Sequence, residues 1–593
     1  MTTATTVRER SPFVGGRRDT NGARLWFSRL HSGPLVAFWV LIVAILVLPI
    51  VLFLLVAFSP ALLGQGPQWF TTDAFGSALS GGFRQAAVNS LVVGVLAGVA
   101  ATLIGSGVAW AVARTDVPGR AVWSGTMFAL LLAPSYLIAL GWERLLEPAG
   151  VLDLLGARTG AVRGAFYGAF GVVVVLTVKG VPFAYLALSG ALRGLGEAYE
   201  AAARVHGAGP LGTARMIASL LAPAFWSAFA IVFAESVSDF GVAATLANDA
   251  HFPVATYALY NAVDSFPVNF PVAAAVGWVL MGMAGLALLA QTAAMRGRSY
   301  RVLGGRNRPA RRHRLSRGAR LVSVGALSAV VGIGLGVPVF GAVAASLVQG
   351  LGSLVGQHGL TLENYARVIR SPALHAPLVF SAELAAATAT VSVALGTVSA
   401  RLLSAREGRV AGRLLDLLLL TAVALPGIVF AAGYIFTYNL PLTNAIGIHL
   451  YGTSSLLFLA YVATALPATS RVLLGSVGQV QESLRQAGRV HGSGPLGAWL
   501  RTVLPVLSRP LLGAWTLTFA ATLLELPVSQ LLYPPGRPPV SVGITKALAN
   551  YDFGGGTAME VVAILCALAV MGATWGLYRV LAPAGWRRIG TAS

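Results

Sequence analysis

The sequence is poor in charged and thiol side chains. Charged residues make up 11% of its 593 residues, only two of them are lysines, and Cys566 is the one cysteine. Soluble proteins average about 25% charged residues, so water is not the main solvent of this chain. One cysteine excludes an internal disulfide and a cysteine-based metal site. There is also no Gly-x-x-x-x-Gly-Lys-Ser/Thr motif, which excludes ATP binding through a phosphate loop in this chain.

Long hydrophobic runs are abundant instead. Hydrophobic residues make up 56% of the chain, and they gather in stretches of roughly 20, the length that crosses an apolar layer about 30 Å thick as a helix. The sequence therefore predicts an all-α membrane protein with about twelve transmembrane helices. The expected spans are 35–59, 87–113, 122–146, 165–190, 223–247, 270–294, 321–347, 379–403, 414–437, 453–475, 509–533 and 559–582.

Arginines account for the net charge of +21 and indicate the topology. They cluster before the first span and after the second, fourth and sixth, as the positive-inside pattern requires. Acidic residues dilute the arginines of the opposite loops. We therefore expect a multi-pass protein of the bacterial inner (plasma) membrane with both termini cytoplasmic, and the N-terminal segment shows no signal-peptide cleavage pattern. This explanation of the charge needs no nucleic-acid partner.

The chain contains an internal repeat. The nonapeptide that begins at Arg204 recurs at Arg489 with eight of nine positions identical, and similar offsets map Pro182 onto Pro467. Pro134 and Ser90 map onto Pro426 and Ser381 in the same way. Two homologous six-helix halves in the same orientation follow. The expected domains are a cytoplasmic tail (1–33), the first half (34–295), a cytoplasmic linker (296–320), the second half (321–583) and a cytoplasmic C-terminal tail (584–593).

The linker carries ten arginines without apolar periodicity. A run of solvated charges beside an anionic membrane leaflet explains this composition, and lipid or nucleic-acid binding is the alternative.

Each repeated nonapeptide lies between the fourth and fifth spans of its half. Both predict a short helix that stops at a glycine, Gly207 or Gly492, the residue best able to take a left-handed cap. Pro210 and Pro495 then open the next helix. We call these two helix-turn-helix segments the elbows. An elbow of this shape is suited to docking into a groove on a partner protein.

At these residues the chain resembles the permeases of binding-protein-dependent ABC importers. Their signature is Glu-Ala-Ala, three residues, Gly, nine residues, Ile, one residue and Leu-Pro. The second copy reads Gln486-Ala-Gly with Gly492 and Leu504-Pro505, whereas the first has Ala201 in place of the glutamate and no Leu-Pro. The resemblance implies a type I ABC importer permease fold. The coupling residues it implies are Glu200, Ala201, Ala202, Arg204, His206, Gly207, Pro210, Gln486, Ala487, Gly488, Arg489, His491, Gly492, Pro495, Leu504 and Pro505.

The resemblance also implies partners. These are two ABC ATPase subunits on the cytoplasmic side, one per elbow, and an extracytoplasmic solute-binding protein, with the lipid bilayer around the helices. It implies a transport permease, not an enzyme, with ATP hydrolysis in separate subunits. We expect no cofactor, no catalytic residue and no resident metal site.

Charged residues inside the spans indicate a substrate path or an internal partner. They are Glu143, Lys179, Glu235, Asp239, Glu383 and Glu525. Glu235 and Asp239 lie four apart on one helix face, and the repeat places Glu525 about level with Asp239. Their surroundings resemble the ferric-iron branch of the family, and ferric ion prefers oxygen ligands. The alternatives are that these carboxylates cap helix ends or bind cationic side chains. Lys179 is expected to pair with a carboxylate such as Glu143, or to extend to the interface.

Other functions stay open on the sequence. The same permease type serves thiamine, phosphonates, polyamines and other small solutes. A proton- or sodium-coupled transporter would also have twelve spans and membrane carboxylates, although it has no need of two matched elbows. An assembly protein of the membrane is a third alternative.

Overall fold

The computed structural model describes residues 33–148, 152, 159–295, 312–348, 360–405, 409–445, 447–480 and 482–583. The predicted N-terminal tail, C-terminal tail and most of the linker lie outside these ranges. Within them the chain is helical, and its β-structure is one isolated bridge between Thr115 and His313. In these ranges ten helices are long and apolar enough to cross a membrane, and the number is twelve if each of two bent helix pairs is one span. The predicted all-α membrane fold is confirmed.

The first half contains six such spans in chain order. The first span is α2 (Gly33–Ile42), the π-helix η1 (Val43–Val47) and α3 (Leu48–Val56). The others are α5 (Gly81–Arg114), the bent pair α6 (Arg120–Leu132) and α7 (Ser135–Leu146), α10 (Ala169–Gly194), α12 (Pro210–Ser238) and α14 (Phe270–Met295). Shorter elements are η2 (Ala61–Leu63), α4 (Asp73–Ala78), α9 (Gly160–Phe166), α11 (Glu197–Val205), the π-helix η3 (Ala243–Ala247) and α13 (Ala255–Asp264).

The second half follows the same order. Its first span is α15 (Arg317–Val331), the π-helix η4 (Gly332–Gly336) and α16 (Val337–Ser346). The others are α18 (Pro372–Ser404), the bent pair α19 (Arg409–Ala424) and α20 (Gly427–Tyr438), α22 (Ser454–Gly478), the π-helix η5 (Trp499–Val503) with α25 (Leu504–Leu523), and α28 (Phe553–Leu581). Shorter elements are α17 (Glu363–Arg370), α21 (Pro441–Ala445), α23 (Glu482–Val490), α24 (Pro495–Ala498), α26 (Pro527–Leu532) and α27 (Val540–Ala549).

Two pairs of spans differ from the continuous helices that we predicted. The third span of each half is broken, with bends of 97° between α6 and α7 and 106° between α19 and α20. The breaks fall at Pro134 and Pro426, because proline forces the residue before it out of the helical region. The fifth spans end earlier than expected, α12 at Ser238 and α25 at Leu523, and a short helix follows each.

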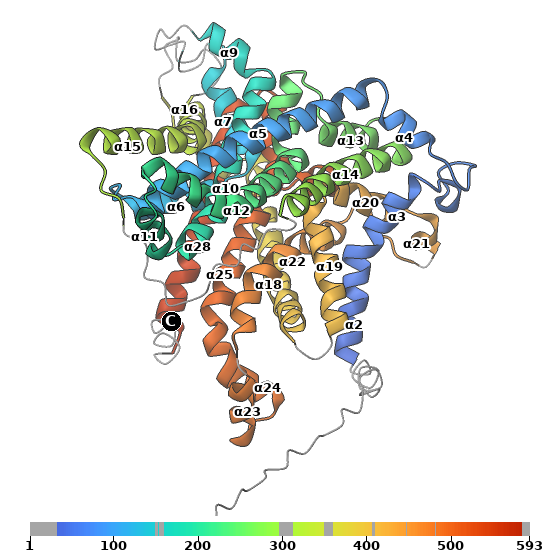
Figure 1. Cartoon of the computed structure of the whole chain (residues 1–593). Helices are drawn as coiled ribbons and strands as arrows, with labels where there is room; N and C mark the ends of the chain where they lie inside the picture. The colour runs from blue at the N-terminus through green and yellow to red at the C-terminus, as the bar shows by residue number, and fades with distance from the viewer. Residues whose placement is uncertain are drawn as a thin grey trace, which may run out of the picture.

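The first span of each half packs against the other half. The α3 helix packs on α20 of the second half, and α16 packs on α7 of the first half as well as on α28 of its own half. Glycines allow backbone contact at both crossings: a Cβ on Gly433 would lie 2.8 Å from the Pro49 carbonyl oxygen, and one on Gly141 would lie 2.3 Å from that of Pro338. In Figure 1 the long helices between residues 81 and 295 cross the long helices between residues 372 and 581. The α2 and α3 helices run parallel to this second set.

Candidate translocation site and coupling elbows

The two elbows have the same local geometry. Gly207 and Gly492 have φ values of 77° and 80°, the left-handed cap that the sequence predicts. In each elbow the next residue's N–H returns to the helix: Ala208 donates to the Ala203 carbonyl over 3.0 Å and Ser493 donates to that of Gly488 over 3.2 Å. These bonds are those of a Schellman cap, which explains why both helices stop where they do.

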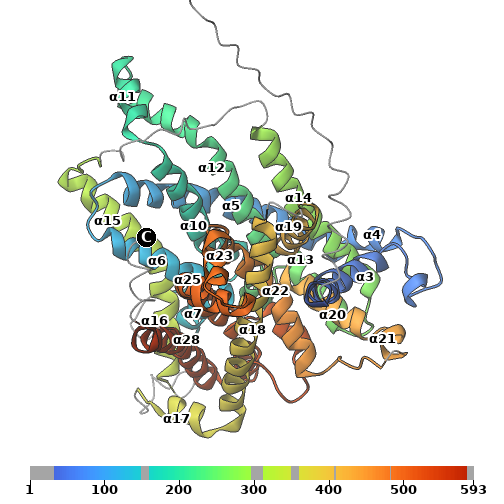
Figure 2. The same ribbon diagram turned by 90° about the horizontal axis from the view of Figure 1, so that it is seen from below.

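The elbows present matched exposed surfaces. Val205 is 84% exposed and Val490 is 85% exposed, so each elbow carries an apolar residue at its tip. His206 and His491 each hydrogen-bond through Nδ1 over 2.8 Å to the carbonyl oxygen four residues earlier. Other exposed members of the predicted set are Ala201, Ala202, Arg204, Gly207, Gln486, Ala487, Arg489 and Gly492. Figure 1 shows α23 projecting from the helical body, and Figure 2 shows the same for α11.

Glu200 faces the helical body instead of this exposed surface. It is 6% exposed, and Arg114 at the end of α5 donates to it over 3.1 Å. The Arg114 guanidinium also donates to the carbonyl oxygens of Leu192 and Leu195 over 3.0 and 2.7 Å. This buried ion pair fixes the first elbow helix, α11, to the ends of α5 and α10.

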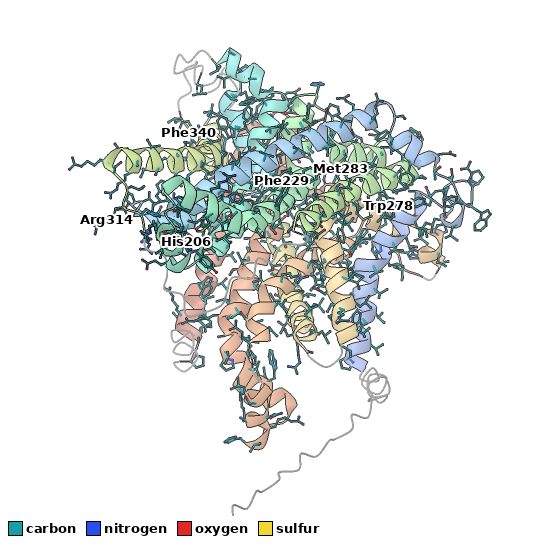
Figure 3. The ribbon with its side chains drawn as sticks, viewed as in Figure 1. His206, Phe229, Trp278, Met283, Arg314 and Phe340 are labelled. Atoms are coloured by element: carbon teal, nitrogen blue, oxygen red, sulfur yellow. The ribbon has the colours of Figure 1, made fainter. Side chains whose placement is uncertain are left out.

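The described end of the linker contacts the same Arg114–Glu200 ion pair. His313 lies 3.7 Å from Glu200, and its N–H donates to the Arg114 carbonyl oxygen over 2.8 Å. Asp116 accepts the Leu315 N–H and pairs with Arg320 over 2.9 Å. The Leu315 hydrogen bond is the main reason why the pKa of Asp116 is lowered. Figure 3 shows Arg314 and His206 on the same side of the molecule.

The elbows differ in the helix that follows them. In the second half the π-helix η5 separates the elbow from α25, and Leu504-Pro505 comes directly after it. Proline has no N–H to continue the helical ladder, so the helix widens before it. The same sequence of π-helix and proline occurs at Pro49 and Pro338. The first elbow lacks Leu-Pro and continues into α12 without such a π-helix.

Asp239 and Glu525 lie where the broken third and fifth spans of a half meet. Asp239 accepts the N–H of Val242 over 2.7 Å and a hydrogen bond from the Ser135 hydroxyl, directly after the break in the third span. Glu525 accepts the N–H of Val528 over 2.8 Å, and its Oε1 lies 4.0 Å from where a Cβ on Gly427 would be. Both carboxylates thus cap the short helix that begins after the fifth span.

Glu235 lies with Asp239 and Lys179 but not with Glu525. The charges of Glu235 and Asp239 act on Lys179, whose ammonium donates to the carbonyl oxygens of Leu131 and Ala133 over 2.8 and 2.7 Å. Lys179 therefore caps the broken end of α6, and Glu143 is not its partner. The Glu235 side chain is exposed on α12.

Ser90 and Ser381, equated by the repeat, have equivalent roles. Ser90 accepts the N–H of Ala255 at the start of α13 over 2.9 Å, and Ser381 accepts that of Val540 at the start of α27 over 2.7 Å. Ser90 and Asp239 also line one small cavity with Thr256. In the described ranges, no group of three or more His, Cys, Asp or Glu side chains could hold a metal ion.

The sequence interpretation missed three buried polar residues. Arg114 was assigned to the loop charges, although it is 2% exposed. Glu560 is 2% exposed within α28, and it escaped notice because it stands at the predicted edge of the last span. Tyr136, also 2% exposed, carries no charge and so gave no signal in an apolar segment.

Comparisons with known proteins agree with the transmembrane helices. No family model matches the chain. It is 23% identical to a ferric transport system permease protein of Actinobacillus pleuropneumoniae, over 82% of this chain and 69% of that protein. It is 24% identical to a protein of Sinorhizobium fredii described as an ABC transporter permease, over 74% and 77%. Over most of its length the chain is therefore similar to ABC transporter permeases.

One shorter match concerns a different solute. A trehalose/maltose transport system permease of Thermococcus litoralis is 28% identical over 33% of this chain and 68% of its own length. An ABC importer permease of this kind is a multi-pass inner-membrane transport protein, not an enzyme.

Proposed function

We propose that this permease forms the translocation path for ferric iron. The observation that carries the proposal is that Asp239 and Glu525 take the same place after the fifth span of each half, with Glu235 one helical turn before Asp239 and Lys179 beside these two acidic residues of the first half. Capping a helix leaves the charge of a carboxylate in place, so the net charge of this group is negative. Such a field attracts a trivalent cation and repels an anionic solute. Broken helices near the middle of a bundle are also where transporters place their substrates.

The elbows support coupling to two ATPase subunits, one at each elbow. Their caps, exposed valines and histidine orientations match, so each offers the same surface to an identical partner. The proposed orientation places both termini and both elbows in the cytoplasm and a solute-binding protein on the other side. The arginine pattern of the sequence supports this orientation.

Replacement of Glu235, Asp239 and Glu525 by their amides tests the proposal. The amides preserve side-chain size and remove the charge. Ferric uptake should collapse while the ATPase subunits still co-purify with the permease. Retained uptake would contradict the proposal, and lost assembly would show that the carboxylates are structural.

A polyamine is the second candidate solute, because the same negative field attracts an organic cation. Competition of ferric uptake by excess putrescine separates the two.

An ion-coupled transporter would continue uptake after ATP depletion while an ion gradient is held, and the ATPase-coupled permease would stop.

A further inference from the structure

The end of the linker lies against the first half. Residues 312–316, which we call the linker end, lead directly into α15. The isolated β-bridge joins His313 of the linker end to Thr115, the residue after α5. The His313 N–H donates to the Arg114 carbonyl oxygen over 2.8 Å, and the Asp116 N–H donates to that of His313 over 3.2 Å. Two backbone hydrogen bonds therefore fix the start of the second half to the end of a helix of the first half.

The linker end also contacts the first elbow. The Nε2 of His313 lies 3.7 Å from the Oε2 of Glu200 on α11, and the His313 ring stacks on Trp110 of α5 with centroids 6.2 Å apart. Leu315 and Tyr199, a residue of α11, pack against the same apolar cluster. The elbow of the first half thus touches the segment that leads into the second half.

Glu200 connects these contacts. Arg114 pairs with its Oε1 over 3.1 Å, and His313 faces its Oε2. Arg114 is 2% exposed and Glu200 is 6% exposed, so separation of the elbow from α5 would leave a buried charge without its main partner, which is unfavourable. Asp116 adds to the attachment, because its carboxylate accepts the Leu315 N–H over 2.9 Å. The Glu200 carboxylate therefore binds a group of α5 through one oxygen and faces a group of the linker end through the other.

The second elbow lacks this arrangement. The register of the repeated nonapeptides puts Arg485 where Glu200 stands, so a base replaces the acid. Alignment of the last residues of α5 and α18 puts Ser404 where Arg114 stands. The second elbow has instead the π-helix η5, which has no counterpart after the first elbow in the described residues, and π-helical turns are frequent at functional sites. The two elbows therefore share their exposed surface but differ in their attachment.

We propose that the linker end positions the first elbow, so that α15 and α11 move as one unit. His313 acts through Glu200 and is a positioning residue of the coupling step. This inference rests on the proposed function, under which both elbows bind ATPase subunits. It makes the coupling unequal, because the first elbow follows the first span of the second half, whereas the second elbow turns at η5.

Spin labels measure this positioning without any transport. The full chain in lipid nanodiscs carries Val205→Cys at the tip of the first elbow and Leu321→Cys on α15, two exposed positions, in a Cys566→Ser background. The linker variant is Asp116→Ala with His313→Pro, which removes a carboxylate acceptor, a backbone donor and the imidazole. Loss of these contacts favours detachment of the linker end by about tenfold, and the distribution of distances between the labels should become about twice as wide.

The linker end supplies its own matched control. Arg314→Ala removes an exposed side chain that takes no part in the contacts above, and it should leave the distance distribution unchanged. A second pair of labels, at the exposed Val490 of the second elbow and the exposed Val410 of α19, should not respond to the linker variant. An unchanged distribution between the first elbow and α15, or equal widening at both pairs of labels, would overturn the proposal.

A disulfide tests whether the contact acts in transport. Thr115→Cys with His313→Cys, again with Cys566→Ser, removes the imidazole and offers a covalent bond in its place. Paired backbone segments lie about 4.8 Å apart, within the Cα separation of roughly 4.4–6.8 Å that a disulfide spans. In cells with a reducing cytoplasm the thiols stay free, and ⁵⁵Fe³⁺ uptake should fall about threefold, as expected for the loss of a partly exposed ion pair. In cells with an oxidising cytoplasm the disulfide forms, and uptake should return to that of the unaltered chain in the same strain.

Two results of the uptake measurement would contradict the proposal. Full uptake with free thiols would show that the contact is not needed, and loss of uptake with the disulfide would show that the contact must open during transport. If the cysteine pair does not accumulate in the membrane, His313→Ala is compared with Arg314→Ala, and equal uptake by these two variants would overturn the proposal as well. If the unaltered chain takes up no ⁵⁵Fe³⁺ in either strain, the proposed function fails, and the label distances alone decide whether the linker end positions the first elbow.

Discussion

Gly492 offers the sharpest test of how the second elbow acts. Its φ is 80°, and a Cβ built on it would meet nothing within 4 Å. The cost of Gly492→Ala is therefore backbone strain alone, about 1–2 kcal/mol for an L-residue in this region. Leaving this conformation instead breaks the Gly492 N–H bond to Arg489 and the Ser493 N–H bond to Gly488, each worth about 0.5–1.5 kcal/mol. Both routes disfavour the native elbow by a similar amount.

A change of that size lowers the ratio of native to altered elbows by roughly 5–30-fold. Permease and ATPase subunits reconstituted in proteoliposomes should show ATP-driven uptake that falls in the order Gly, Asn, Ala, Val at position 492. Asparagine ranks second because it tolerates the left-handed region better than other L-residues. Membrane abundance should stay constant, since the elbow lies outside the packed core.

Gly494→Ala is the matched control. It lies two residues away, its Cβ would also meet nothing within 4 Å, and its φ is not positive. It should couple normally. Equal uptake by Gly492→Ala and Gly494→Ala, at equal abundance, would refute the argument from the cap.

Two further predictions concern the first elbow and the topology. Arg114→Ala removes the guanidinium that donates to the buried Glu200 and leaves only His313, 3.7 Å away, beside that carboxylate. It should cost about 3–5 kcal/mol, measured as a lower melting temperature in detergent. Arg320→Ala, which removes an exposed pair, should cost about 1 kcal/mol or less, and similar melting temperatures for both variants would contradict the role of burial. Single cysteines at Ser316 and Pro148, in a chain whose own cysteine is replaced, should react with membrane-impermeant reagents from opposite sides, and labelling of both from one side would exclude the proposed topology.

Periodicity and length were enough to predict the spans, because a membrane allows few ways to satisfy the backbone. The repeat was enough to locate the elbows, and Gly207 and Gly492 have the predicted caps. The breaks were not predicted, although Pro134 and Pro426 were recognised as a matched pair. A proline inside an apolar run does not by itself separate a kinked helix from a broken one. The outcome depends on which groups cap the free ends, as Lys179 does for α6.

The carboxylates show a different limit of the sequence. The repeat correctly paired Asp239 with Glu525, which have the same capping role. It could not show that the helices of Glu143 and Glu560 both pack on α16, because these helices lie more than 400 positions apart in the chain. Nothing in the local pattern around Glu143 distinguishes a lipid-facing position from a seam between halves.

The exchange of first spans between halves bears on how the protein is made. The α3 helix is complete at residue 56, yet its partner α20 ends only at Tyr438. At 5–20 residues per second of synthesis, α3 waits roughly 20–80 s for that partner. Neither half expressed alone can bury the surfaces that α3 and α16 share with the other half. Joining both halves in one polypeptide supplies every first span with the surface that it needs from the other half, in equal number and in a fixed order.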